Sequence, residues 1–430
     1  MAQTFNVKMV EEAYEHLRGV VKETPLQFHA GLSHHFGARI YLKREDLQVV
    51  RSYKLRGAYN RMRMLSAAEK KRGVVCASAG NHAQGVAFSC KALKVQGIIF
   101  MPRNTPKQKI ERVRTLGGSF VTIELCGDSF DESFAEAKSV SEKKKMILVH
   151  PFNDPFVIAG QGTVGAEILE QLSAKSGSAS GGKEQIDLVV VPIGGGGLCS
   201  GLGSYMKWKS PRTKIIGVEP TGAPAMDQAL KAGMVVTLEK LDTFVDGAAV
   251  RTVGDITFKL CKKVLEKLIL VPEGKVCETM ISLYQRDGIV AEPAGALAIA
   301  ALNQLKEELS ARGGEKTVVC IVSGGNNDVS RYPEIIERSL VYKGLKHYFM
   351  INFSQRPGAL RRYLNEALGP SDDITLFEYT KKNNREMGPA LVGIELTRKE
   401  DLKPLLRRMD AIGMSYELLK SDSPVFKFII

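Results

Sequence analysis

The stretch 188-LVVVPIGGGGL-198 joins an apolar, β-branched run to four consecutive glycines and then to a helical segment. A run that is apolar at nearly every position predicts a strand buried on both faces, as in a parallel sheet covered by helices. Glycines that directly follow such a strand can form a nest of backbone amides around a phosphate. A flexible loop without a ligand is the alternative interpretation of these glycines.

The same alternation of apolar strands and helical stretches extends from the N-terminus to about residue 330. We expect strands at Ile40–Leu42, Gly73–Cys76, Gly97–Met101, Phe120–Leu125, Ile147–Val149, Leu188–Pro192, Ile215–Val218 and Val318–Val322. We expect helices at Lys107–Leu116, Ser129–Lys143 and Val164–Leu172. This order predicts an α/β architecture with a parallel sheet.

The rhythm changes after about residue 330. The pattern there predicts, in chain order, a strand at Lys346–Phe353, a helix at Pro357–Leu368, strands at Ile374–Lys381 and Ala390–Leu396, a helix at Lys399–Ile412 and a strand at Ser415–Leu419. This βαββαβ order is typical of a compact α+β domain. We therefore expect one domain over residues 1–330, a connector over 331–343 and a second domain over 344–430.

Composition argues against several classes of protein. The chain of 430 residues is 44% apolar and 25% charged, which is typical of a globular protein, and no apolar run could span a bilayer. The first ten residues do not resemble a secretory signal, so we expect a cytoplasmic protein. Seven scattered cysteines without a Cys-x-x-Cys pair favour neither disulfides nor a zinc site. The net charge of +13 is spread among acids, which favours a solvated surface over nucleic-acid binding.

A segment that resembles a phosphate-binding P-loop occurs at Gly177–Lys183. Glu184 stands where a Ser or Thr would reach magnesium, and the segment precedes a strand instead of following one. We interpret it as a surface loop.

Three further segments carry residues suited to chemistry. Arg51–Ala58, RSYKLRGA, places Lys54 just before an apparent helix, where packing could lower its pKa for Schiff-base chemistry. Ala77–Gly85, ASAGNHAQG, puts Ser78, Asn81 and His82 at a helix start, which suits a carboxylate. Val322–Asn327, VSGGNN, puts Ser323 at the carboxyl end of a strand, where α/β proteins bind ligands. A solvated lysine, an ordinary helix cap and a plain turn are the respective alternatives.

The ordered set of these motifs resembles the fold-type II pyridoxal-phosphate enzymes, and more closely their threonine dehydratases. The resemblance covers nearly all of residues 5–330 and includes Thr24-Pro25-Leu26, Lys43-Arg44-Glu45-Asp46-Leu47-Gln48 and Ala291-Glu292-Pro293-Ala294-Gly295-Ala296. Residues 340–430, with Arg356-Pro357-Gly358-Ala359-Leu360, resemble the ACT-like regulatory domain of biosynthetic dehydratases. Together, these resemblances imply a tryptophan synthase β-like fold of two open α/β subdomains, followed by one ACT-like domain.

The resemblance also implies a role for each motif. Lys54 would hold pyridoxal 5'-phosphate and act as the catalytic base. Gly194, Gly195, Gly196 and Gly197 would bind the cofactor phosphate, Asn81 the ring hydroxyl and Ser323 the pyridine nitrogen. Ser78, Asn81 and His82 would hold the carboxylate of L-threonine. The product would be 2-oxobutanoate, with isoleucine as inhibitor, valine as possible antagonist and a homotetramer as the assembly.

Several alternatives remain open at this point. A serine racemase or serine dehydratase would share the fold, although a regulatory domain favours a biosynthetic first step. A non-catalytic amino-acid sensor would not need Lys54, the glycines and Ser323 together. Related enzymes often place a cation near the position of Glu219, but Ala225 stands about where a second acid would be expected. The sequence therefore does not favour a divalent site, a monovalent ion at Glu219 is the alternative to no ion, and we expect no metal.

Overall fold

The structure is a computed structural model that describes residues 4–176, 185–310, 314–381, 385–420 and 423–429. The chain divides into two compact units. The first comprises residues 1–273 and 282–327, and the second comprises 274–281 and 328–430. The P-loop-like segment Gly177–Lys183 lies outside the described residues.

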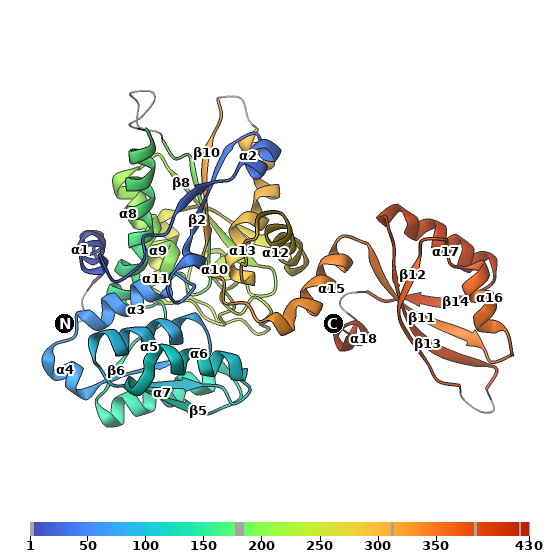
Figure 1. Cartoon of the computed structure of the whole chain (residues 1–430), viewed down its shortest axis with the longest axis horizontal. Coiled ribbons are helices and arrows are strands. Elements are labelled where there is room, and N and C mark those ends of the chain that lie inside the picture. Colours follow the sequence, from blue (N-terminus) through green and yellow to red (C-terminus); the bar gives the residue numbers. More distant parts are fainter. Residues whose placement is uncertain (1–3, 177–184, 311–313, 382–384, 421–422, 430) are drawn as a thin grey trace. The chain divides into compact units, whose positions relative to one another are not determined.

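A six-stranded sheet in the order β1-β2-β10-β7-β8-β9 forms the centre of the first unit (Figure 1). Its strands are β1 (Leu26–Phe28), β2 (Arg39–Arg44), β7 (Leu188–Pro192), β8 (Lys214–Pro220), β9 (Leu265–Val271) and β10 (Thr317–Val322). All neighbours are parallel except β1, which runs antiparallel to β2. The central strands β7 and β10 are buried at every position, as the continuous apolar runs predict.

A second sheet of the same unit has four parallel strands in the order β5-β4-β3-β6. These strands are β3 (Val74–Ala77), β4 (Gly97–Met101), β5 (Val121–Leu125) and β6 (Ile147–Leu148). The helices α5 (Asn81–Leu93), α6 (Lys107–Gly117) and α7 (Phe130–Lys144) connect them. The chain therefore leaves the larger sheet after β2, builds the smaller one, and returns at β7. The fold predicted from the sequence, two α/β subdomains, is confirmed.

The chain has further helices between residues 8 and 309. They are α1 (Lys8–Leu17), α2 (Ala30–Phe36), α3 (Lys54–Arg63), α4 (Ala67–Arg72), α8 (Pro155–Ser176), α9 (Gly197–Lys209), α10 (Ala225–Ala232), α11 (Asp255–Val264), α12 (Glu273–Asp287), α13 (Pro293–Ala300) and α14 (Lys306–Leu309). Each sheet has an apolar core of its own. The first turn of α3 is also anchored by a fully buried guanidinium, because Arg56 donates to Glu45 and Glu167 at 2.6–2.8 Å.

The second unit contains an antiparallel sheet in the order β12-β13-β11-β14. Its elements are α15 (Tyr332–Tyr342), β11 (Lys346–Ser354), α16 (Ala359–Glu366), β12 (Asp373–Tyr379), β13 (Met387–Glu395), α17 (Leu402–Ala411), β14 (Ser415–Leu418) and α18 (Pro424–Ile429). The predicted βαββαβ order is present between β11 and β14. Alternate residues of β11 and β13 join α16 and α17 in a separate apolar core. Residues 331–343, which we expected to be a connector, contain the whole of α15.

Two strands of the larger sheet, β1 and β9, were missed in the sequence, and both lie at its edges. β9 follows α11 without an intervening turn residue, since α11 ends at Val264 and β9 begins at Leu265. It lies at the edge of the sheet and carries the exposed charges Glu266 and Lys267. An edge strand needs no continuous apolar run, so its sequence resembles an extension of the helix before it.

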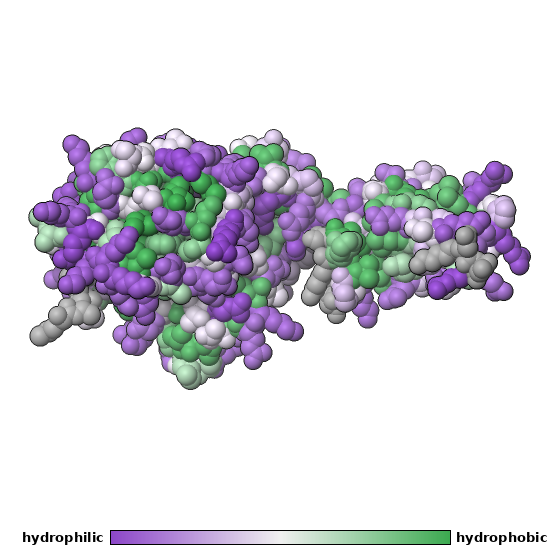
Figure 2. All heavy atoms as spheres, turned by 90° about the horizontal axis from the view of Figure 1, so that it is seen from below, coloured by the Kyte–Doolittle hydropathy of each residue, from purple (hydrophilic) through white to green (hydrophobic). Residues whose placement is uncertain are grey.

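The surface carries many charged side chains, and several of them form ion pairs with neighbours. On the face drawn in Figure 2, hydrophilic side chains are spread over both units and alternate with hydrophobic patches. Several lysines pair with acids nearby, for example Lys209 with Glu11 at 2.7 Å and Lys267 with Glu308 at 2.6 Å. None of the helices in the described ranges combines the length and the apolar character that a membrane span requires.

Candidate active site

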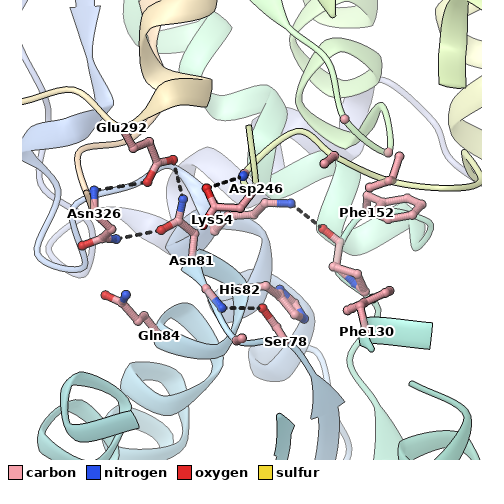
Figure 3. Close-up of a pocket in the computed structure, with 18 of the residues that line it drawn as sticks. Lys54, Ser78, Asn81, His82, Gln84, Phe130, Phe152, Asp246, Glu292 and Asn326 are labelled. Carbon is pink, nitrogen blue, oxygen red and sulfur yellow. Dashed lines mark hydrogen bonds between the residues drawn. The ribbon is translucent and has the colours of Figure 1, made fainter. Parts of the chain in front are cut away.

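A cavity of about 370 Å³ lies in the first unit, and segments far apart in the sequence line it. Three of these segments directly follow β3, β7 and β10, and Lys54 begins α3. The carboxyl ends of parallel strands lie at one edge of a sheet, where α/β proteins bind ligands. Figure 3 shows Lys54, Asn81 and Glu292 meeting in this cavity. The structure thus brings Lys54, the Ser78–His82 loop and the four glycines together.

Lys54 offers an amine that is poised to lose its proton. The side chain is only partly exposed, and its Nζ donates a hydrogen bond to the carbonyl oxygen of Pro151 at 3.2 Å. Burial lowers the pKa of this amine from 10.5 to about 8, although the nearby carboxyl of Glu292 acts in the opposite direction. An amine with such a pKa can act as a nucleophile or a base near neutral pH.

The loop Ser78–His82 leads from β3 into α5. Its turn is stabilised by a hydrogen bond from the Gly80 N–H to Ser78 Oγ at 3.1 Å. The Nε2 atom of His82 lies 2.8 Å from the carbonyl oxygen of Val149, and burial, aided by Lys54, lowers the pKa of this imidazole to about 3. The imidazole is therefore neutral and Nε2 carries its proton. His82 Nδ1 and Gln84 Oε1 are buried without a partner among the described residues, so a ligand could satisfy them.

Gly194 to Gly196 form the turn between β7 and α9 and Gly197 begins α9, and two of these glycines are required by the structure. A Cβ atom on Gly195 would lie 2.2 Å from the ring of Phe152, so no larger residue fits. Gly196 has φ +90°, a conformation that other residues rarely adopt. The turn ends at the amino end of α9, a helix of thirteen residues. Unpaired backbone N–H groups and the helix dipole make such a position suitable for a phosphate.

Ser323 and Glu219, which the sequence analysis considered, do not line the cavity. Ser323 is buried at the end of β10, where its carbonyl oxygen accepts from the Tyr53 N–H at 3.2 Å, but it is not among the lining residues. Glu219 accepts hydrogen bonds from the backbone N–H groups of Met226 and Asp227 at 2.7 and 2.9 Å. Its carboxyl thus caps α10, and burial raises its pKa to about 8.

Sequence reasoning assigned no role to three polar residues of the cavity. Glu292 and Asn326 hydrogen-bond to Asn81 at 2.6 and 2.7 Å, and Asp246 pairs with Lys109 at 2.7 Å. Glu292 and Asn326 belong to the motifs Ala291–Ala296 and Val322–Asn327. The position of Asn326 after a strand is the feature of the sequence that could have indicated a site residue. Asp246 follows neither a strand nor a glycine cluster, so nothing in the local sequence distinguishes it.

Two family matches cover the chain, and the boundary between them lies close to residues 327–328, where the fold also changes from the first unit to the second. Residues 17–324 match the family described as pyridoxal-phosphate dependent enzyme. Residues 337–429 match the C-terminal regulatory domain of threonine dehydratase. The chain is 52% identical over 418 residues to the biosynthetic L-threonine dehydratase of Halalkalibacterium halodurans, with 97% of each chain covered. It is 51% identical over 424 residues to that of Bacillus subtilis, with 99% of this chain and 97% of the relative covered.

Solved structures resemble the catalytic part of the chain. The processed form of threonine deaminase isoform 2 from Solanum lycopersicum superposes with a TM-score of 0.71 at 38% identity, over 79% of this chain and 96% of that one. The maize serine racemase superposes with a TM-score of 0.70 at 31% identity, over 79% of this chain and 99% of that one. The likeness therefore extends to enzymes of two different named activities.

Proposed function

The chain belongs to the pyridoxal-phosphate-dependent enzymes and, within them, to the biosynthetic threonine dehydratases, and from this membership we propose its reaction. It removes water and ammonia from L-threonine and yields 2-oxobutanoate, the first step of isoleucine biosynthesis. The observation that carries this proposal is the identity to biosynthetic dehydratases over nearly the whole length, the second unit included.

The cavity fits pyridoxal phosphate as its cofactor. The glycine turn before α9 offers backbone N–H groups to a phosphate, and its close packing against Phe152 leaves no room for a side chain at Gly195. Lys54 places an amine of lowered pKa in the same cavity, as a covalent bond to an aldehyde requires. When bound, the cofactor supplies an electron sink for the electrons released at the substrate Cα.

The residues of the chain then have distinct roles in the reaction. Lys54 holds the cofactor and, once displaced, its unprotonated Nζ takes the proton from the substrate Cα as a general base. Gly194 to Gly197 bind the phosphate through backbone N–H groups. Asn81 binds the ring hydroxyl and Ser323 the pyridine nitrogen. These assignments rest on the family resemblance and on the position of all but Ser323 in the cavity wall.

The substrate carboxylate is held by the loop that contains Ser78, Asn81 and His82. The first turn of α5 has free backbone N–H groups, and the helix dipole favours an anion there. Because the imidazole of His82 is neutral, this residue contributes hydrogen bonding and shape without adding charge. Lys54 is thus the only base we assign to the Cα proton.

Regulation and assembly form the second part of the proposal. The second unit would bind isoleucine as an inhibitor and valine as an antagonist, since it matches the regulatory domain of threonine dehydratases. Effector control requires two sites with a coupling free energy between them. We further propose a homotetramer in the cytoplasm, where seven free cysteines would remain reduced.

Purified protein loaded with pyridoxal phosphate tests the reaction directly. We expect 2-oxobutanoate and ammonia from L-threonine in equal amounts, with Lys54→Ala abolishing turnover. Isoleucine should suppress the reaction. Pyruvate or D-serine from L-serine, with no turnover of threonine, would instead favour the activities of the serine enzymes that share this fold.

A further inference from the structure

Three side chains in the cavity form a closed set of hydrogen bonds (Figure 3). The Nδ2 atom of Asn81 donates to Glu292 Oε1 at 2.6 Å, and Asn326 Nδ2 donates to Asn81 Oδ1 at 2.7 Å. The backbone N–H of Asn326 donates to Glu292 Oε2 at 3.1 Å. We call this set, Asn81 with Glu292 and Asn326, the amide triangle.

The direction of every hydrogen bond in the amide triangle is fixed by two backbone groups. Asn326 Nδ2 also donates to the carbonyl oxygen of Val50 at 2.8 Å, and a carbonyl can only accept. The nitrogen of the Asn326 amide must therefore face both Val50 and Asn81. The atom of Asn81 that meets it has to be Oδ1, which leaves Nδ2 facing Glu292. An asparagine amide can in general be turned either way, but here only one orientation satisfies its neighbours.

Glu292 completes the set because its carboxylate has two acceptor atoms. One oxygen receives the Asn81 amide and the other receives a backbone N–H that cannot change its role. Glu292 is 4% exposed, so a mismatched donor there would not be relieved by water. Burial, together with the charge of Asp246, raises the pKa of this carboxyl to about 7, whereas its bonds from Asn81 and Asn326 and the charge of Lys109 favour the ionised form.

The orientation has a consequence for the cavity. Nδ2 of Asn81 has two hydrogens, and Glu292 receives one of them. Among the hydrogen bonds of the described residues the second N–H has no partner, and Asn81 lines the cavity. With the amide reversed, the same position would present a carbonyl oxygen, which repels an oxygen atom of a ligand.

We propose that Glu292 and Asn326 are positioning residues that hold the Asn81 amide in one orientation, so that its free N–H binds an oxygen atom of the bound cofactor. The inference rests on the proposed function, since it takes pyridoxal phosphate as the ligand of the cavity. Glu292 acts through Asn81 and needs no contact with the reacting atoms.

Glu292→Gln tests this role because it removes one acceptor and adds one donor. Whichever way the new amide turns, two N–H groups must then face each other within the amide triangle. We expect the apoprotein to bind pyridoxal phosphate at least tenfold more weakly, measured by titration of its absorbance, and to melt at a lower temperature. Asp246→Asn is the matched control, since it removes a carboxylate whose charge raises the pKa of Glu292 but leaves every hydrogen bond of the amide triangle in place. Binding by Glu292→Gln as tight as that of the unchanged protein would overturn the proposal.

The double variant Glu292→Gln with Asn81→Asp tests whether cofactor binding needs the N–H of Asn81 or only a matched set of hydrogen bonds. Its net charge equals that of the natural chain, and its donors and acceptors match again, because the carboxylate introduced at position 81 would accept from both Asn326 and the new glutamine. This position, however, would then present a carboxylate to the cavity. We expect the melting temperature of the apoprotein to return and the cofactor affinity to stay low.

Recovery of cofactor affinity in the double variant would mean that matched hydrogen bonds suffice and that the N–H of Asn81 does not bind the cofactor, and it would overturn the proposal. The double variant also keeps the test possible if Glu292→Gln does not fold. Both readouts are independent of threonine turnover. A protein that binds pyridoxal phosphate but does not deaminate threonine would contradict the proposed reaction and still decide the role of Glu292.

Discussion

At the scale of single residues, the site depends on side chains whose chemistry is altered by their surroundings. Lys54 has a lowered pKa because its amine is shielded from water, and His82 is neutral for the same reason. Burial also raises the pKa of the Glu292 carboxyl to about 7, although hydrogen bonds to both of its oxygens favour the charged form. The cavity thus holds an amine of lowered pKa, a neutral imidazole and an oriented amide within one small volume.

The pH dependence of cofactor capture follows from the amine of Lys54. Only the unprotonated form attacks an aldehyde, and that form increases as pH rises through the pKa of about 8. We expect the rate of pyridoxal phosphate binding to apoprotein to rise about tenfold per pH unit up to pH 8 and then level off. Stopped-flow absorbance measures it.

The imidazoles of His82 and His150 should add no second pH-dependent step to this rate profile, because burial lowers their pKa values to about 3 and 4. Glu292→Gln should lower the midpoint, since the charge of this residue raises the pKa of Lys54. A midpoint near 10.5, the ordinary value for lysine, would contradict the assignment.

At the scale of secondary-structure elements, the glycine turn between β7 and α9 depends on the neighbouring Phe152. In Gly195→Ala the new methyl group would meet the phenyl ring, so the turn has to move and its N–H groups lose their common direction. We expect the affinity for pyridoxal phosphate to fall at least tenfold in an equilibrium titration. Adding Phe152→Ala should restore part of it by making room. Gly165→Ala in α8, where an added Cβ has ordinary contacts, is the control that should leave the affinity unchanged.

The first turn of α3 is anchored by buried charges. Arg56 is 0% exposed and bonds to Glu45 on one side and Glu167 on the other, while Lys43 reaches Glu167 at 2.6 Å. Removing Arg56 leaves the buried Glu45 carboxylate without the guanidinium that it binds, although Glu167 keeps Lys43, so Arg56→Met should cost about 3–5 kcal/mol of unfolding free energy. Urea denaturation measures this.

An exposed ion pair provides the comparison for Arg56. Arg18 pairs with Glu15, and both side chains are about 60% exposed. Arg18→Met should therefore cost no more than about 1 kcal/mol. Equal losses in the two variants would show that the buried charges do not anchor α3 as we infer.

At the scale of the whole molecule, each unit has its own core, and every residue lining the cavity belongs to the first unit. A chain ending at Lys343 keeps α15, whose Tyr342 packs against Gly274 at the start of α12. We expect this truncated protein to deaminate threonine at a rate within a few-fold of the full chain and to lose inhibition by isoleucine. Initial rates across an isoleucine titration measure both properties. Inhibition that persists would place the effector site in the first unit.

Much of the architecture could be predicted because it is local in the sequence. A buried strand such as β7 is apolar at consecutive positions whatever its partners are, and the glycines after it mark a turn. β9 could not be predicted in the same way, since it is an edge strand that follows a helix without a break. The resemblance of the motifs to a known family also predicts that Lys54 and the glycines bind one cofactor, and in the structure they line one cavity.

The amino-acid sequence by itself thus determined the fold class, the order of both domains and the lysine and glycines of the site. Only the tertiary structure decided which groups meet them and in which orientation. Glu292 and Asn326 lie 211 and 245 residues from Asn81, and no periodicity joins positions so far apart. The physical reason is that hydrogen-bond direction depends on what surrounds a group in space. A backbone carbonyl at Val50 and a backbone N–H at Asn326 fix that direction here, and only folding brings them to the same amide.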